Sequence, residues 1–367
     1  FWMKVAIVGA GNGGLTACAD LKERGFEVSL FESDKFCKDL DFIKKEGGLY
    51  LCEGEIGSSE GEKGKFIEID LISDDINEVI KGAEVVMVVA PGVAIEYFAR
   101  ILAPVVNEDQ IILINCAACM APVRFINEAK EMGINKRFKI AETNTLTYGT
   151  RAIVESAKIE LYLRAKKVYL AAYPSSDNEE VFEVCKKLYD CFVLAKNILQ
   201  VNLENGNPEV HPGPCLLNAG RIDFSGGEFW LYREGITEHT INVLEAVEKE
   251  RIALGRALGF EVEGALEARQ NRGYFSQDEK TLQEHFNTSE VFTQIKGPTS
   301  VTSRYFTEDI STGLVFWSDL GKALGVPTPN IDAIIVLASS LLKTDFYAEG
   351  LTLDKLGLDK ANLDKVM

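Results

Sequence analysis

Histidine and basic side chains are both scarce in this sequence of 367 residues. It contains only three histidines, and 39 Lys and Arg stand against 56 Asp and Glu, which leaves a net charge of −17 and an isoelectric point near 4.8. A surface of that sign repels phosphate backbones and anionic lipid headgroups. We therefore expect neither a nucleic acid nor a membrane as partner, and local Arg, Lys or backbone N–H groups must hold any anionic ligand.

Long apolar runs and a regular cysteine framework are missing as well. Even the apolar stretch 331–342 is too short to span a bilayer, and it contains Asp332. The eight cysteines are scattered, and Lys4 is followed by a short strand pattern instead of the apolar region of a signal peptide. These features predict a cytoplasmic protein.

One C-x-x-C pair is present, formed by Cys116 and Cys119. Such a pair can be a redox couple or half of a zinc site, but no second pair with metal-ligand spacing occurs in the chain. We therefore predict no metal, and we favour two small residues that line a strand end over a redox role.

The first thirty residues contain the motif around which the chain is organised. The apolar run 5–8 predicts a strand buried on both faces, and Gly9, Gly11 and Gly14 follow it at G-x-G-x-x-G spacing before an apolar-striped helix. The glycines allow a tight turn, close approach of a diphosphate and close helix packing, and the helix N-terminus favours the negative charge. The residues that we expect to contact a dinucleotide are Gly9, Gly11, Asn12, Gly13, Gly14, Ala90 and Pro91.

Glu32 ends the second predicted strand, residues 26–31, at the distance from the glycine turn where an acidic residue binds the adenosine ribose. Its carboxylate can accept hydrogen bonds from both ribose hydroxyls and repels a 2′-phosphate. The sequence therefore predicts NAD as the cofactor, with NADP left open because Lys35 could still reach a phosphate.

Strand and helix patterns alternate through residues 1–198, which predicts right-handed crossovers and a parallel sheet. After about residue 198 helical patterns dominate. The expected fold is α/β, with an N-terminal Rossmann doubly wound parallel sheet (1–198) and a mostly α-helical C-terminal domain (199–367). Expected elements include a helix at 34–46, short strands within 47–75 around a polar loop at 55–62, strands at 83–90, 110–115 and 139–142, and helices at 97–106, 237–258 and from Pro329. The helix from Pro329 is apolar nearly all round, which predicts a buried central helix of a bundle.

The three histidines differ in their surroundings. His211 lies in a proline-rich segment at the expected domain junction, where a reductase needs a group that moves protons near neutral pH. His239 and His285 lie in polar helical stretches, and we expect both to be exposed. Thr143 and Thr145 follow the strand at 139–142, at the edge where doubly wound sheets bind ligands.

Several motifs together resemble the opine dehydrogenases. They are Asn207-Pro208-x-x-His211-Pro212 with Leu216-Leu217-Asn218-Ala219, Glu234-Gly235-Ile236-Thr237, Arg304-Tyr305-Phe306-Thr307-Glu308-Asp309 with Gly313-Leu314, Gly325-Val326-Pro327-Thr328-Pro329, and Glu349-Gly350 with Leu356-Gly357-Leu358. The resemblance implies a Rossmann domain, a helical domain like the C-terminal domain of 6-phosphogluconate dehydrogenase, and NAD(P)H-dependent reductive condensation of a 2-oxo acid, such as pyruvate, with the amino group of an amino acid. A homodimer is compatible with it.

The resemblance also implies roles for single residues. His211 corresponds to the acid/base of the family and Asp309 to the carboxylate that orients it. We expect Asp309 to contact one ring nitrogen of His211, which leaves the other facing the substrate. Arg304 corresponds to the guanidinium that binds a substrate carboxylate, and Asn207 to an amide at the reacting centre. Thr143 or Thr145 would contact substrate.

Two other functions remain compatible with the sequence. A reductase of the ketopantoate or glycerol-phosphate type shares this domain order, and it would reduce a ketone without an amine. A non-catalytic NAD-binding sensor needs the glycine turn alone. NADH oxidation that requires both a 2-oxo acid and an amine would exclude the two alternatives.

Overall fold

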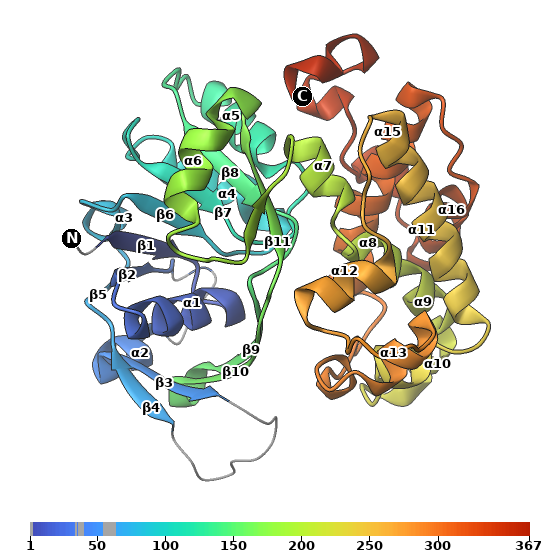
Figure 1. Ribbon diagram of the computed structural model, residues 1–367, viewed down its shortest axis with the longest axis horizontal. Coiled ribbons are helices and arrows are strands. Elements are labelled where there is room, and N and C mark those ends of the chain that lie inside the picture. The colour runs from blue at the N-terminus through green and yellow to red at the C-terminus, as the bar shows by residue number, and fades with distance from the viewer. Residues whose placement is uncertain (1–2, 34, 36–39, 54–63) are drawn as a thin grey trace. The chain divides into compact units, whose positions relative to one another are not determined.

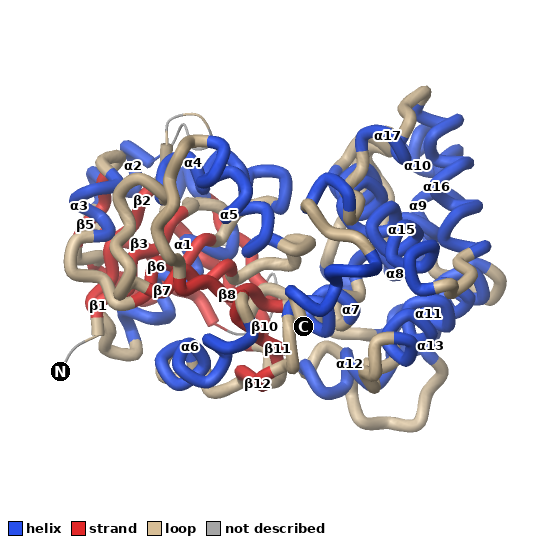
Figure 2. The backbone as a smooth tube through the Cα atoms, turned by 90° about the horizontal axis from the view of Figure 1, so that it is seen from above, coloured by secondary structure: helices blue, strands red, loops and turns tan. Residues whose placement is uncertain are grey.

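The computed structural model describes residues 3–33, 35, 40–53 and 64–367. They form two compact units, Phe1–Ile198 and Leu199–Met367. Figure 2 shows strands in the first unit and mainly helices in the second. We describe each unit by itself.

The first unit is built on an eight-stranded sheet with the order β12-β11-β8-β7-β6-β1-β2-β5. Its central strands pair in parallel, as expected, whereas β11 runs antiparallel to β8 and parallel to β12. The strands of this sheet are β1 (Lys4–Val8), β2 (Glu27–Phe31), β5 (Leu71–Ser73), β6 (Val85–Val88), β7 (Ile111–Ile114), β8 (Lys139–Thr143), β11 (Val168–Tyr173) and β12 (Phe192–Leu194).

Both faces of this sheet are covered, which explains its continuous apolar strands. Val5 and Ile7 of β1 pack in one core with α1, while Ala6 and Val8 pack in a second core on the opposite face with α4. The helices of this unit are α1 (Asn12–Glu23), α2 (Leu40–Glu46), α3 (Ile76–Ile80), α4 (Ile95–Leu102), α5 (Ala121–Glu131) and α6 (Asn178–Cys185).

A smaller sheet packs over α1, with the order β4-β3-β10-β9 (Figure 1). Its strands are β3 (Gly48–Glu53), β4 (Lys65–Glu68), β9 (Tyr148–Ile153) and β10 (Lys158–Arg164). The expected polar loop 55–62 lies outside the described residues, as does most of the first turn of the helix expected at 34–46, which is observed as α2.

The second unit is helical, and among its described residues the only strand-like pairing is a single bridge between Trp230 and Gly297. With α7 (Ile198–Leu203), which begins at the boundary, its helices are α8 (Asn207–Val210), α9 (Pro212–Leu217), α10 (Ala219–Ser225), α11 (Thr240–Ala257), α12 (Ala265–Arg272), α13 (Leu282–Thr288), α14 (Arg304–Glu308), α15 (Val315–Leu324), α16 (Pro329–Leu342) and α17 (Phe346–Glu349). Two π-helical turns, η4 (Leu231–Gly235) and η6 (Asp309–Leu314), interrupt this arrangement.

Two expected details of the helical unit are wrong. The helix expected from Thr237 begins at Thr240 instead, and the Thr240 hydroxyl accepts a hydrogen bond from the Thr237 backbone N–H. Helix α16 was expected to be buried all round, yet Val336, Leu337 and Leu341 are exposed, so only one face of α16 packs in the core.

Candidate active site

The glycine turn has the geometry that its sequence predicts. Gly9 has a φ of +115°, and a Cβ there would lie 2.1 Å from the carbonyl oxygen of Val89. A Cβ on Gly14 would lie 1.8 Å from the carbonyl oxygen of Gly9, so the start of α1 can approach the turn only without a side chain. A Cβ on Gly11 would meet nothing within 4 Å. Gly9 and Gly14 are therefore required by the fold itself, whereas the space beside Gly11 suits a ligand.

Glu32 directly follows β2, and its side chain contacts the glycine turn. Its carboxylate accepts hydrogen bonds from the backbone N–H of Ala10 at 2.7 Å and of Ser33 at 2.9 Å. Burial raises the pKa of Glu32, and these two hydrogen bonds partly offset that effect. The carboxylate therefore belongs to the turn as well as to the expected ribose site.

The other predicted cofactor residues lie around the same turn. The side-chain oxygen of Asn12 accepts a hydrogen bond from the Ala152 backbone N–H at 2.9 Å, so this side chain ties β9 to the start of α1. Gly13 packs against the side chains of Leu146 and Val89. Ala90 is half-buried and Pro91 exposed, just beyond β6.

The carboxyl end of β8 carries several polar groups. The Thr143 hydroxyl donates to the Thr145 carbonyl at 2.8 Å, and Thr143 is buried while Thr145 is half-buried. Glu142, which the sequence analysis did not single out, is completely buried and accepts one hydrogen bond, from the Ala121 backbone N–H at 3.0 Å. Burial raises its pKa to about 8, and its second carboxylate oxygen has no partner among the described residues. Cys116 and Cys119, after β7, are half-buried and buried.

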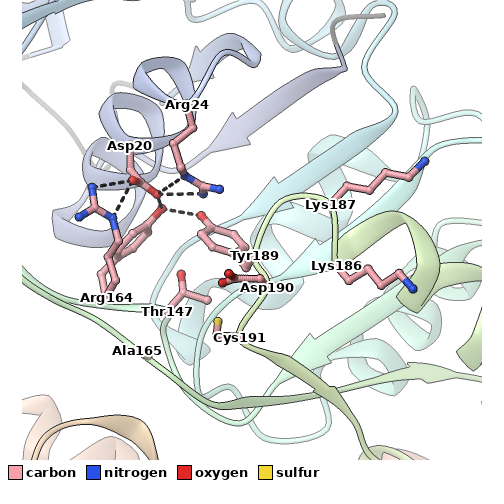
Figure 3. Close-up of a pocket in the computed structure, with 11 residues that line it drawn as sticks. Asp20, Arg24, Thr147, Arg164, Ala165, Lys186, Lys187, Tyr189, Asp190 and Cys191 are labelled. Carbon is pink, nitrogen blue, oxygen red and sulfur yellow. Dashed lines mark hydrogen bonds and ion pairs between the residues drawn. The ribbon is translucent and has the colours of Figure 1, made fainter.

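A pocket of about 330 Å³ lies at the C-terminal end of α1, which is the end remote from the glycine turn. Figure 3 shows an ionic cluster among its lining residues, in which Asp20 accepts hydrogen bonds from Arg24 and Arg164. The Tyr148 hydroxyl also donates a hydrogen bond to Asp20. Both guanidinium groups are thus already bound to a buried carboxylate. This cluster anchors β9 and β10 on α1, and the pocket is not the dinucleotide site.

In the helical unit, His211 and Asp309 are in direct contact although 98 positions separate them in sequence. His211 follows α8, Asp309 begins η6, and Nδ1 of the imidazole lies 2.7 Å from a carboxylate oxygen of Asp309. His211 is 8% exposed, so this pair is largely shielded from water. A carboxylate at this distance orients the ring.

Close packing explains why these two segments meet. A Cβ on Gly313 of η6 would lie 2.5 Å from the ring of Pro208 in α8, so a glycine is needed for α8 and η6 to touch. The π-helical turn η6 then places Asp309 beside His211, and π-helical turns often occur at functional sites.

Two tyrosines complete the surroundings of His211, and the sequence analysis missed both. The Tyr232 hydroxyl lies 2.8 Å from Nε2, and the Tyr305 ring lies 4.1 Å from the imidazole, centroid to centroid. The sequence could have indicated both tyrosines, because Tyr232 lies two residues before the Glu234-Gly235 motif and Tyr305 is part of the Arg304-Tyr305 motif. We expected the second ring nitrogen to face substrate, so the contact with Tyr232 corrects that view.

The other predicted residues of this unit are Arg304 and Asn207, and no hydrogen bond, ion pair or ring contact among the described residues joins either side chain to His211. The Arg304 side chain is 64% exposed and lies 3.8 Å from the Glu308 carboxylate, one turn along α14. Asn207 is half-buried at the start of α8, and its backbone N–H donates to the Asn205 side chain at 3.0 Å.

The remaining histidines were predicted to be exposed. His239 is exposed, whereas the prediction for His285 is wrong. His285 is buried in α13, where it stacks on Phe275 and contacts the Asp278 carbonyl with Nε2. Its neighbours Glu284 and Thr288 are exposed.

No group of three or more His, Cys, Asp or Glu side chains that could hold a metal ion occurs in the described part of the chain. Across the same residues no helix is both long and apolar enough to cross a membrane.

Taken together, the two units define a class of protein. The open space at Gly11, the N-terminus of α1 and the Glu32 carboxylate fit a dinucleotide, and the helical unit holds a shielded His–Asp pair suited to proton transfer. This combination is that of a nicotinamide-dependent dehydrogenase with a Rossmann unit and a helical unit.

Comparison with known proteins gives the family. Residues 194–342 match the family model described as NAD/NADP octopine/nopaline dehydrogenase, alpha-helical domain, and residues 7–37 match an NAD(P)-binding Rossmann-like domain. The chain is 33% identical over 353 residues to an opine dehydrogenase of Arthrobacter sp. (strain 1C), covering 96% of this chain and 94% of that one. The chain belongs to the opine dehydrogenase family, and it is an NAD-dependent oxidoreductase that acts on CH–NH donors.

Solved structures share the fold. Octopine dehydrogenase with NADH and L-arginine gives a TM-score of 0.73 at 20% identity, covering 93% of this chain and 90% of that one. Octopine dehydrogenase with NADH and pyruvate gives 0.71 at 19% identity, covering 92% and 88%. A ketopantoate reductase from Ralstonia eutropha gives a lower score, 0.61 at 17% identity, covering 93% and 99%. The alternative reductase class is thus a more distant neighbour.

Proposed function

We propose that this opine dehydrogenase condenses pyruvate with the amino group of an amino acid and reduces the resulting imine with NADH. Pyruvate is supported by its presence with NADH in an octopine dehydrogenase structure. The observation that carries the proposal is the 2.7 Å contact between His211 and Asp309, because dehydration and imine reduction both need a positioned proton donor.

The nicotinamide supplies the hydride when it is bound. The chain's own groups bind, orient and move protons. The N-terminus of α1 and the glycine turn hold the diphosphate, and Glu32 accepts hydrogen bonds from the ribose. His211 donates the proton that lets water leave from the carbinolamine, and Asp309 holds the imidazole in the orientation from which this proton is donated.

Substrate contacts come from three further groups in this proposal. The exposed guanidinium of Arg304 binds a carboxylate with two parallel hydrogen bonds once substrate replaces its weak contact with Glu308. Asn207 hydrogen-bonds the reacting centre, and the hydroxyl of Thr143 or Thr145 contacts substrate. A homodimer and a cytoplasmic location stay predictions.

The test is a screen of NADH consumption with pyruvate and a panel of amino acids, each substrate also being supplied alone. We expect NADH oxidation only when pyruvate and an amino acid are both present. Oxidation with pyruvate alone would instead favour a ketone reductase. NADH binding without oxidation under any combination of these substrates would contradict the proposed function.

A further inference from the structure

Both ring nitrogens of His211 have a hydrogen-bond partner. Nδ1 lies 2.7 Å from a carboxylate oxygen of Asp309, and Nε2 lies 2.8 Å from the Tyr232 hydroxyl. Because an ionised carboxylate can only accept, Nδ1 carries a hydrogen whether the ring is neutral or protonated. Nε2 is therefore the nitrogen at which His211 gains and loses its proton, and Tyr232 is the partner of this nitrogen.

The Tyr232 hydroxyl suits both protonation states of Nε2, because a phenol can donate and accept. It donates its hydrogen to Nε2 of the neutral ring and accepts from Nε2–H of the imidazolium, while Asp309 accepts from Nδ1–H in both states. The two contacts can thus stay in place while the proton comes and goes. A ring flipped about its Cβ–Cγ bond would instead present carbon atoms to both partners, so the pair of contacts selects one orientation of the imidazole.

Tyr232 itself is held in place by its packing. It lies in the π-helical turn η4 and is 3% exposed. Its ring packs against Phe292 at 4.5 Å and Phe286 at 5.7 Å between centroids. The Asn287 side chain donates to the backbone carbonyl of Tyr232 at 2.8 Å and to that of Ile236, just after η4, at 3.0 Å. A ring packed against two others, on a backbone tied at two points, keeps its hydroxyl beside Nε2.

Nothing else in the described part of the chain can replace this hydroxyl. Asp309 and Tyr232 are the only hydrogen-bond partners of the His211 ring found among the described residues. His211 is 8% exposed, so water has little access to its ring. A buried nitrogen that loses its partner is destabilising, and the ring then shifts to satisfy it or stays without a hydrogen bond. Removal of the hydroxyl alone should therefore change the position or the hydrogen bonding of Nε2.

We propose that Tyr232 is a second positioning residue for His211, which together with Asp309 fixes the orientation of the imidazole and holds Nε2 in place for proton exchange with the substrate. This inference rests on the proposed function and adds the residue that controls the reactive nitrogen of its acid/base. Tyr232 acts through His211, and no contact between Tyr232 and the substrate is required.

The first test compares Tyr232→Phe, which removes the hydroxyl and keeps the packed ring, with a matched control, Tyr274→Phe. Tyr274 packs on the same Phe292, at 4.9 Å, and no hydrogen bond or ring contact joins it to His211 among the described residues. We expect Tyr232→Phe to lower kcat about tenfold to a hundredfold, because a misplaced acid/base slows the chemical step. The KM for pyruvate and the Kd for NADH should stay within about twofold of wild type, and Tyr274→Phe should retain wild-type kcat. An unchanged kcat in Tyr232→Phe would overturn the proposal.

Replacement of Tyr232 by 4-aminophenylalanine separates the hydrogen bond from a purely structural role. The amino group of this residue can donate to Nε2 from the same place, whereas phenylalanine cannot. We expect this variant to have a higher kcat than Tyr232→Phe and to restore the hydrogen bond at Nε2. A restored hydrogen bond without any gain in kcat would overturn the positioning role.

The hydrogen bond itself is measured without turnover. 15N NMR of histidine-labelled protein with a neutral His211 should show Nδ1 protonated and Nε2 accepting a hydrogen bond in the wild type and in Tyr274→Phe, and Nε2 without it in Tyr232→Phe. An unchanged Nε2 signal in Tyr232→Phe would overturn the proposal whatever the substrates are. A wild type that fails to oxidise NADH with pyruvate and any amino acid, but shows this NMR difference, would instead refute the proposed function.

Discussion

His211 is held by groups from two separate segments of the helical unit, η4 and the continuous stretch α14–η6. Asp309 and Tyr232 hold its two nitrogens, and Tyr305 packs on its ring. A buried imidazole with both nitrogens satisfied keeps one orientation, which is what a group that transfers protons needs. The pair with Asp309 should therefore behave as a unit.

We predict that His211→Asn lowers turnover by about two to four orders of magnitude, the range for a positioned acid/base. Asp309→Asn should give a loss of the same kind, and the double variant should be little worse than His211→Asn, because residues that act together are not additive. Initial rates in both directions and NADH binding measure this. Fully additive losses would mean separate roles, and an active His211→Asn enzyme would exclude His211 as the acid/base.

In the proposed site Glu32 has two roles, to accept a hydrogen bond from the Ala10 N–H and to bind the ribose, and different substitutions can separate them. We predict that Glu32→Gln raises the efficiency with NADPH relative to NADH by about tenfold, because the amide does not repel a 2′-phosphate but can still accept from the Ala10 N–H. Glu32→Ala should also lower Tm, since it leaves that N–H without its acceptor. Kinetics with both cofactors and thermal melts test this, and an unchanged cofactor ratio in both variants would place the ribose elsewhere.

Glu142 makes stability depend on pH. Its pKa is raised by burial to about 8, so between about pH 4.5 and pH 8 the folded chain keeps a proton that the unfolded chain releases. Stability must then fall as pH rises through this window. We predict that Tm falls by about 2–5 °C more between pH 6 and pH 8.5 in the wild type than in Glu142→Gln. If Tm fell by the same amount between pH 6 and pH 8.5 in both proteins, Glu142 would not titrate in this range.

At the scale of elements, the turn between β1 and α1 serves the fold and the ligand with different glycines. Gly14 allows α1 to approach the turn, while the space beside Gly11 is open to solvent or ligand. Adding a methyl group should therefore mainly reduce stability at Gly14 and mainly weaken cofactor binding at Gly11.

We predict that Gly14→Ala lowers stability by more than about 2 kcal/mol, because its Cβ would overlap the Gly9 carbonyl. Gly11→Ala should cost well under about 1 kcal/mol, as a helix cap changed from Gly to Ala, but should weaken NADH binding on the order of tenfold. Melting and NADH titration of both variants check this. Wild-type NADH affinity in Gly11→Ala would show that the diphosphate does not approach there.

At the scale of the whole molecule, the net charge of −17 should slow the approach of anionic ligands. We predict that the association rate of NADH rises about two- to fivefold between about 10 mM and about 150 mM salt, because added ions screen the repulsion. Stopped-flow fluorescence measures this rate. A rate that falls with salt would indicate that a local basic region, and not the net charge, controls the encounter.

Sequence alone determined the features that depend on neighbouring residues. The strand, glycine turn and helix of residues 4–23 follow from apolar runs and from glycine spacing, which are patterns within a short stretch of sequence. The pairing of His211 with Asp309 could be stated in advance only because their motifs resemble those of a known family.

Tertiary packing decided the rest, because burial and long-range contacts are not written in local patterns. His285 was expected to be exposed from its polar neighbours and is buried, and α16 was expected to be buried all round and exposes one face. Tyr232 reaches His211 because η4 packs against α9 and α13, an arrangement that no spacing in the sequence reveals. Which groups satisfy the second nitrogen of His211 is set by the folded helical unit.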